Sequence, residues 1–118
     1  MQAEEVRDYC LSKAGATEGF PFDQETLVFK VGGKLFLLMS LEKQPLAFNV
    51  KTDPNWSEEL REQYPQIIPG YHMSKKHWNT IYTEGLKRNL LLELINHSYD
   101  LVFSSLSKKQ REEILSQR

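Results

Sequence analysis

One stretch of the chain, residues 67–82, concentrates the side chains that can bind or react. It holds two His, two Lys, one Trp, two Tyr and one Met within sixteen residues, IIPGYHMSKKHWNTIY. Imidazoles can hydrogen-bond, move protons or ligate metals, ammonium groups can meet phosphates, and aromatic rings can stack on bases. The helical and strand-like segments on either side have the composition of a scaffold, so the function is sought in this stretch.

The histidines of the chain do not predict a metal site. Zinc needs three or four ligands in tetrahedral geometry, and His72 and His77 find no further ligand at a recognised spacing in His97, Cys10 or the scattered carboxylates. Cys10 lies on an apolar helical stripe, which favours a buried, inert thiol. His97 lies on a leucine row, which favours a hydrogen-bonded, half-buried imidazole. No nucleophile elbow, P-loop or dinucleotide fingerprint is present, so we expect no enzyme activity, metal or cofactor.

The aromatic rings of this stretch allow two interpretations. Trp78, Tyr71 and Tyr82 either fill the space between a sheet and its helices, or are exposed beside lysines where they can stack on a base or sugar. In a strand over residues 78–83, Trp78 and Tyr82 share one face and Ile81 lies on the other. The sequence alone does not choose which face is buried.

Basic residues gather in the second half of the chain. Residues 69–88 carry four cations against Glu84 alone, although the whole chain has a net charge of -1 and a pI near 6.3. That balance argues against a strongly basic nucleic-acid binder. Lysines also mark the predicted turns: Lys30 and Lys34 flank Gly32-Gly33, and Lys43 lies at the next turn. Such lysines contact phosphates in a binding protein, or simply protect edges and keep the chain soluble.

The hydrophobic periodicity predicts a small α+β domain. Helices are expected at residues 2–13, from the Asp53-Pro54 cap to residue 64, from Asn89 onward, and after a Ser107-x-x-Gln110 capping box. Residues 14–23 read as a turn-rich segment, and Gly32-Gly33 as a hairpin turn. The expected strands are residues 26–31, 34–41, 46–51, 67–68 and 78–83. This order, αβββαββαα, predicts a two-layer sandwich with one antiparallel five-stranded sheet packed against helices.

Length and composition agree with that class. The 118 residues fit a single domain, 1–118, and the 40% hydrophobic and 26% charged residues are typical of a globular protein. We expect no secretory signal and no membrane span. A single cysteine excludes an internal disulfide and fits a reducing, cytoplasmic setting. We expect a monomer.

The chain resembles the YjbR/MmcQ family over nearly all of its length. The most specific segments are Lys51-Thr52-Asp53-Pro54 and the later pattern Pro69-x-x-His72-Met73-x-Lys75-x-His77-Trp78-Asn79. Lys13-Ala14-Gly15-Ala16, Pro21-Phe22 and the final leucine-rich helix are similar too. The resemblance implies a two-layer fold with one antiparallel sheet. It also implies DNA binding, because members are described as DNA-binding proteins with a "double wing" of β-hairpins.

Our leading interpretation is therefore a non-catalytic DNA-binding or more general nucleic-acid-binding module. The candidate contact residues are Lys51, His72, Lys75, Lys76, His77, Trp78, Lys30, Lys34, Lys87 and Arg88. One alternative is a protein- or small-ligand-interaction domain with a pocket at Tyr71, His72 and Trp78. Another is that the His and Trp residues are architectural and lock the turn that contains them.

Overall fold

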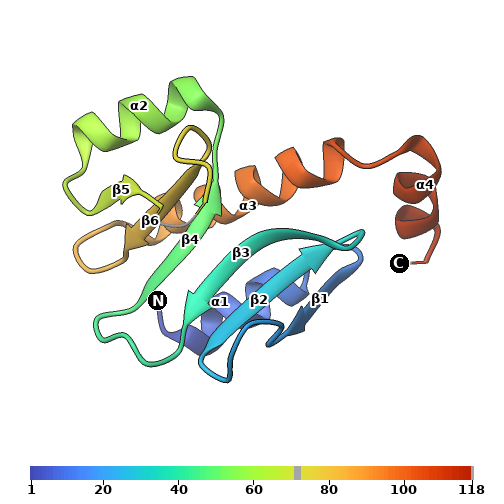
Figure 1. Cartoon of the computed structure of the whole chain (residues 1–118), viewed down its shortest axis with the longest axis horizontal. Coiled ribbons are helices and arrows are strands. Elements are labelled where there is room, and N and C mark those ends of the chain that lie inside the picture. The colour runs from blue at the N-terminus through green and yellow to red at the C-terminus, as the bar shows by residue number, and fades with distance from the viewer. Residues whose placement is uncertain (71–72, 118) are drawn as a thin grey trace.

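The computed structural model describes residues 1–70 and 73–117, which form four helices and a six-stranded antiparallel sheet (Figure 1). The elements are α1 (Ala3–Leu11), β1 (Ala16–Gly19), β2 (Thr26–Val31), β3 (Lys34–Ser40), β4 (Ala47–Lys51), α2 (Pro54–Gln63), β5 (Ile67–Pro69), β6 (Trp78–Tyr82), α3 (Arg88–Ser104) and α4 (Lys108–Ser116). Across the sheet the order is β1-β2-β3-β4-β6-β5. The predicted two-layer α+β class is confirmed.

The first four strands form a meander whose turns follow from the sequence. Gly32 and Gly33 join β2 to β3 with φ angles of 57° and 80°, which residues with a Cβ adopt only at a cost. β3 lies between β2 and β4, in agreement with the run of apolar residues along both of its faces. After α2, the short β5 and then β6 complete the sheet beside β4.

Helices α1, α2 and α3 share one hydrophobic core with a single face of the sheet. Figure 1 shows α1 behind the meander strands and α3 passing behind β4. The core combines residues of these helices with one alternating row from the strands: Val6, Cys10, Leu60, Leu91, Leu94, Ile95, Tyr99, Val102, Leu27, Phe29, Val31, Leu37, Met39, Phe48, Val50, Ile67 and Ile81. Val28, Ala47 and Trp78 are also buried but do not belong to this cluster, since alternation points them to the opposite face.

Two predicted helix starts are confirmed. Asp53 accepts a hydrogen bond from the Asn55 amide at 2.9 Å, and Pro54 occupies the first turn of α2. Ser107 and Gln110 form the reciprocal capping box of α4, which lies at the far end of the molecule in Figure 1. The third helix begins earlier than predicted: its cap is Lys87, without a side-chain cap, and Asn89 lies inside the first turn.

The sheet has one strand more than the five predicted. The extra strand is β1, which lies inside the segment interpreted as turns. Ala16, Glu18 and Gly19 lack the β-branched and aromatic side chains that mark a strand. β1 is an edge strand held by its backbone pairing to β2, with Ala16 opposite Val31 and Gly19 opposite Val28, so its side-chain pattern carries little signal. The other strands agree with the predicted ranges to within one residue at each end.

Candidate nucleic-acid interface

The sheet has an open face, defined here as the strand positions that point away from α1, α2 and α3. The register identifies them, because paired residues share a face. Asn49 is opposite Leu38 on β3 and Thr80 on β6, while Lys30 is opposite Thr17 on β1 and Leu35 on β3. The remaining positions of the open face are Gly19, Thr26, Val28, Ser40, Ala47, Lys51, Ile68, Trp78 and Tyr82.

The open face carries positive charge only. Lys30 and Lys51 are its ionisable strand residues apart from the Tyr82 phenol, and both are half-buried. No Asp or Glu occupies any of the described strand positions that share this face, in a chain with 16 acidic residues. Lys30 lies near one edge, next to β1, and Lys51 is opposite Trp78 on the neighbouring β6. This face is the most consistently cationic part of the sheet.

A polar pair occupies the middle of the open face. The Thr80 hydroxyl donates to Asn49 Oδ1 at 2.6 Å across the β4–β6 ladder. Thr80 is buried, so the half-buried Asn49 amide is the member of the pair that can meet a ligand laid across the strands. Neither residue is among the contact residues predicted from the sequence. The alternation that directs Phe48 and Val50 inward would have pointed Asn49 outward.

The face of the last strand that the sequence left undecided is now resolved. Ile81 is fully buried in the core, so Trp78 and Tyr82 belong to the open face. Trp78 is nevertheless only 9% exposed, whereas Tyr82 is 37% exposed. Lys43 places its ammonium group 5.8 Å from the centre of the Tyr82 ring. Tyr82, not Trp78, is therefore the aromatic ring most available for stacking on this face.

The loop between β5 and β6 brings further cations to one end of the open face. Lys75 and Lys76 are exposed and His77 is half-buried. The loop leads directly into Trp78, the partner of Lys51, and the His77 carbonyl accepts the Thr52 amide at 2.7 Å. Lys51, Lys75 and Lys76 are thus gathered at the same end of the sheet.

A buried polar network holds this loop. The Asn79 amide nitrogen donates to Thr52 Oγ1 at 2.8 Å and to Ser57 Oγ at 3.3 Å, and the Thr52 and Ser57 hydroxyls are hydrogen-bonded to each other. Asn79 Oδ1 accepts from Arg61 Nε at 2.7 Å. Asn79, Thr52 and Ser57 are fully buried. Asn79, which belongs to the motif predicted to bind a ligand, therefore has a structural role inside the protein.

Arg61 connects this hydrogen-bond network to the backbone of the loop. Its Nη2 donates to the Lys75 carbonyl at 2.5 Å and to the Trp78 carbonyl at 3.2 Å. These bonds tie the last turn of α2 to the loop, and they fix the segment that carries Lys75 and Lys76. No sequence signal revealed this network, because its members come from α2, β6 and the residue after β4.

Three of the predicted contact residues lie away from the open face. Lys34 is opposite the core residue Val31, and its ammonium group donates to Ser105 Oγ at 3.3 Å. Arg88 is paired with Glu5 of α1, and Lys87 caps α3. The ionic interaction with Arg88 and the bond from the Gln2 backbone lower the pKa of Glu5. These three cations therefore do not join Lys51, Lys75 and Lys76 in one surface.

Two residues of the predicted site, Tyr71 and His72, lie outside the described residues. The pocket proposed between them and Trp78 therefore has no structural description. Among the described residues, no group of three or more His, Cys, Asp or Glu side chains converges as metal ligands. No helix of the described part is long and apolar enough to cross a membrane.

The remaining reactive side chains are enclosed by the scaffold. Cys10 is fully buried in the core, and desolvation raises the pKa of its thiol to about 12, which keeps it protonated. His97 Nε2 accepts a hydrogen bond from the Asp53 amide at 3.0 Å. Its ring packs edge-on against Trp56, with the two ring centres 4.6 Å apart. Both observations confirm the interpretations made from the sequence, a buried thiol and a hydrogen-bonded histidine.

Fold and site together define a small α+β domain whose core helices pack on one face of an antiparallel sheet. The other face carries Lys30 and Lys51 and is partly covered, since Val28, Ala47, Trp78 and Thr80 are buried on it. A family model described as YjbR matches residues 11–101. The chain therefore belongs to the YjbR family, as the resemblance implied.

Relatives and solved structures agree with this assignment. The chain is 43% identical over 96 residues to the uncharacterized protein YbdF of Escherichia coli O157:H7, covering 80% of this chain and 79% of that one. It is 30% identical over 113 residues to the uncharacterized protein YjbR of Escherichia coli K12, covering 95% and 96%. The crystal structure of Deinococcus radiodurans DR2400, a DUF419 domain, matches with a TM-score of 0.91 at 41% identity, covering 96% and 87%. A Pseudomonas syringae protein matches with a TM-score of 0.73 at 26% identity, covering 86% and 99%.

Proposed function

We propose that this chain is a non-catalytic nucleic-acid-binding module, with DNA as the expected ligand, and that it binds through the open face and the adjoining β5–β6 loop. One observation carries the proposal: the open face presents Lys30 and Lys51 and no acidic strand residue. At the described strand positions of this face, a polyanion meets two lysines and no carboxylate. The proposal includes a monomeric, cytoplasmic protein without a cofactor.

The geometry favours a ligand lying across the strands. Lysine ammonium groups contact backbone phosphates, which position a nucleic acid without reading its sequence. Tyr82 offers a ring for stacking, and the half-buried Asn49 amide, held by the buried Thr80, offers hydrogen bonds. In the described part of the chain, no helix projects from this face to enter a major groove, because α1, α2 and α3 contribute their buried residues to the core on the opposite face. We therefore expect single-stranded DNA to bind more tightly than duplex.

The test is a titration of fluorescently labelled 20-nucleotide DNA, single-stranded and duplex, at several salt concentrations, followed by anisotropy. Contacts from Lys30, Lys51, Lys75 and Lys76 predict a log–log slope of affinity against salt of about -3 on single strands. The Lys30→Gln, Lys51→Gln double variant should weaken binding and reduce the magnitude of that slope by about 1.4. Tyr82→Ala should weaken binding with little change of slope.

The matched control is the Lys108→Gln, Lys109→Gln double variant, which removes the same charge from exposed positions on α4. It should leave affinity and slope as in the unaltered protein. Absence of binding at low salt, binding without salt dependence, or equal losses in the two double variants would overturn the proposal.

A further inference from the structure

A cavity of about 520 Å³ lies at the end of the molecule where α1 meets the end of β1 and the end of β3. It is lined by Ala3, Glu4, Arg7, Glu18, Gly19, Phe20, Leu27, Met39 and Leu41. Leu27 and Met39 are buried core residues, so the cavity reaches the hydrophobic core. Its volume is within the range of about 300–1,000 Å³ that is usual for ligand-binding pockets.

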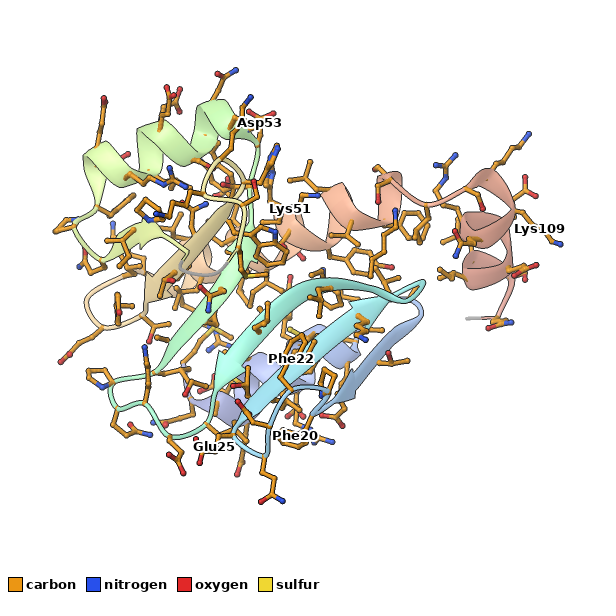
Figure 2. The ribbon with its side chains drawn as sticks, in the orientation of Figure 1. Phe20, Phe22, Glu25, Lys51, Asp53 and Lys109 are labelled. Atoms are coloured by element: carbon orange, nitrogen blue, oxygen red, sulfur yellow. The ribbon has the colours of Figure 1, made fainter. Side chains whose placement is uncertain are left out.

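Two exposed apolar side chains line this cavity, and a third is close by in the sequence. Phe20 and Leu41 line it, and Phe22 follows two residues after Phe20. These three are among the five large hydrophobic residues that are exposed in the described part of the chain. Figure 2 shows Phe20 and Phe22 in the same lower half of the molecule. Apolar side chains grouped in this way mark interaction sites more often than scattered ones do.

The charged residues that line the cavity are two carboxylates and one guanidinium. Glu4 and Glu18 line it, and Arg7 is already paired with Glu18 through two hydrogen bonds of 2.6 and 2.7 Å. That ion pair lowers the pKa of Glu18. The contact leaves Arg7 little capacity to attract an anionic ligand.

Further carboxylates stand beside Leu41. The Leu41 amide donates to the Glu25 carbonyl at 2.9 Å, and Glu42 is the next residue along the chain. The negative charge of Glu42 raises the pKa of Glu25, which means that the two carboxylates repel each other. A cation placed between them would relieve this repulsion.

We propose that the cavity is a docking site for a basic amphipathic segment of a protein partner. An apolar side chain of the partner enters against Leu27 and Met39, and flanking Lys or Arg residues lie beside Glu4, Glu25 and Glu42. Charge complementarity selects this occupant, because the same carboxylates repel nucleic acid and anionic lipid. The site is separate from the open face and does not depend on the proposed function.

The probes are two 12-residue peptides of equal apolar content. One has Leu at helical spacing with Lys between the leucines, and the other has Glu in place of each Lys. A third peptide has Ser in place of Leu. Binding is measured by calorimetry, and its location by amide shifts in heteronuclear NMR spectra. We expect the Lys/Leu peptide to bind and to shift the amides of Gly19, Phe20 and Leu41, and the other two peptides to bind at least about tenfold more weakly.

Matched variants locate the interaction. Leu41→Ser should weaken binding of the Lys/Leu peptide about tenfold, whereas Leu115→Ser should leave it unchanged. The two leucines are 41% and 42% exposed, and they belong to separate parts of the molecule: Leu41 follows β3, and Leu115 lies on α4. Glu25→Gln with Glu42→Gln should weaken binding about three- to tenfold, and Glu112→Gln with Glu113→Gln on α4 should have no effect. Because all of these positions are exposed, the variants are expected to fold.

The docking proposal is overturned if the Lys/Leu peptide does not bind, or if its shifts fall on α2 instead of the cavity. It is also overturned if the Glu/Leu or Lys/Ser peptide binds as tightly, or if Leu41→Ser and Leu115→Ser behave alike. A protein that binds DNA but not the peptide contradicts only the docking site. One that binds the peptide but not DNA contradicts only the proposed function.

Discussion

Asn79 belongs to the sequence motif and also has a structural role in the fold. Its fully buried amide joins Thr52 and Ser57 to Arg61, and through Arg61 the β5–β6 loop. Thr52 and Asn79 belong to the two segments that carry the family resemblance. At least part of that motif is therefore required for positioning the loop, whatever the loop then binds.

The first prediction at this scale concerns Asn79. Asn79→Ala removes the central member of the network: Arg61 Nε loses its acceptor, and the Thr52 and Ser57 hydroxyls lose the amide donor and keep only each other. We expect a loss of about 1–3 kcal/mol in the free energy of unfolding, measured by urea denaturation. Asn55→Ala, at an exposed position in the first turn of α2, should change it by less than about 0.5 kcal/mol. Equal effects of the two changes would contradict a structural role for the network.

His97 gives a prediction about pH. Burial lowers the pKa of His97 from its ordinary value of 6.5, and the neutral ring accepts the Asp53 amide at the start of α2. Because the unfolded chain then binds the proton more readily, this contribution to stability is present above about pH 6.5 and is lost as pH falls below it. The midpoint of thermal unfolding should therefore decrease between pH 7 and pH 5.

Two variants isolate the imidazole responsible. His97→Gln, which cannot titrate, should reduce that decrease, while His77→Gln should preserve it because the bond to Asp53 is left in place. The carboxylates whose pKa values the fold lowers, Glu5, Glu18 and Asp23, titrate below this range and do not interfere. An unchanged pH profile in His97→Gln would rule out this histidine as the cause.

At the scale of elements, the sequence predicted what side chains specify and missed what the backbone alone specifies. Strands β2, β3, β4 and β6, the Asp53 and Ser107 caps and the Gly32-Gly33 turn follow from alternation, capping chemistry and glycine freedom. β1 was missed because an edge strand of small and polar residues pairs through its backbone. The start of α3 was misplaced because Lys87 makes no side-chain cap.

The candidate site was predictable only in part for the same reason. Lys51, Lys75 and Lys76 come together through strand pairing and a loop, and the charge count had already marked two of them. The separation of Lys34, Lys87 and Arg88 from that group depends on which face each element turns to the helices. Nor could alternation show that Trp78 would be almost covered on a face without helices.

The β2–β3 hairpin supplies the prediction that belongs to this scale. A Cβ added at Gly32 would lie 2.7 Å from the side chain of Leu106, a buried residue in the connection between α3 and α4. A Cβ added at Gly33 would meet nothing within 4 Å. Both positions have positive φ, so Gly33→Ala should cost about 1–2 kcal/mol from backbone strain alone. Gly32→Ala should cost more because Leu106 must also move. Urea denaturation of the pair measures the difference, and equal costs would mean that the hairpin tip is not held against Leu106.

At the scale of the whole molecule, a net charge of -1 conceals a separation of charge. The open face and the β5–β6 loop carry lysines, while Glu4 and the Arg7–Glu18 pair line the cavity at another end. Glu25 and Glu42 lie beside Leu41 at its edge. α2 also exposes Glu58, Glu59 and Glu62. A nucleic acid and a basic peptide would therefore be directed to different surfaces, and each would be repelled from the surface that suits the other.

The two outermost strands also limit how copies of this chain can meet. β1 has four residues and ends in a glycine, and β5 has three and ends in a proline. A foreign chain aligning along either border would find only a short template, and Pro69 has no amide hydrogen to offer. The brevity of both borders therefore discourages strand-to-strand assembly into fibres.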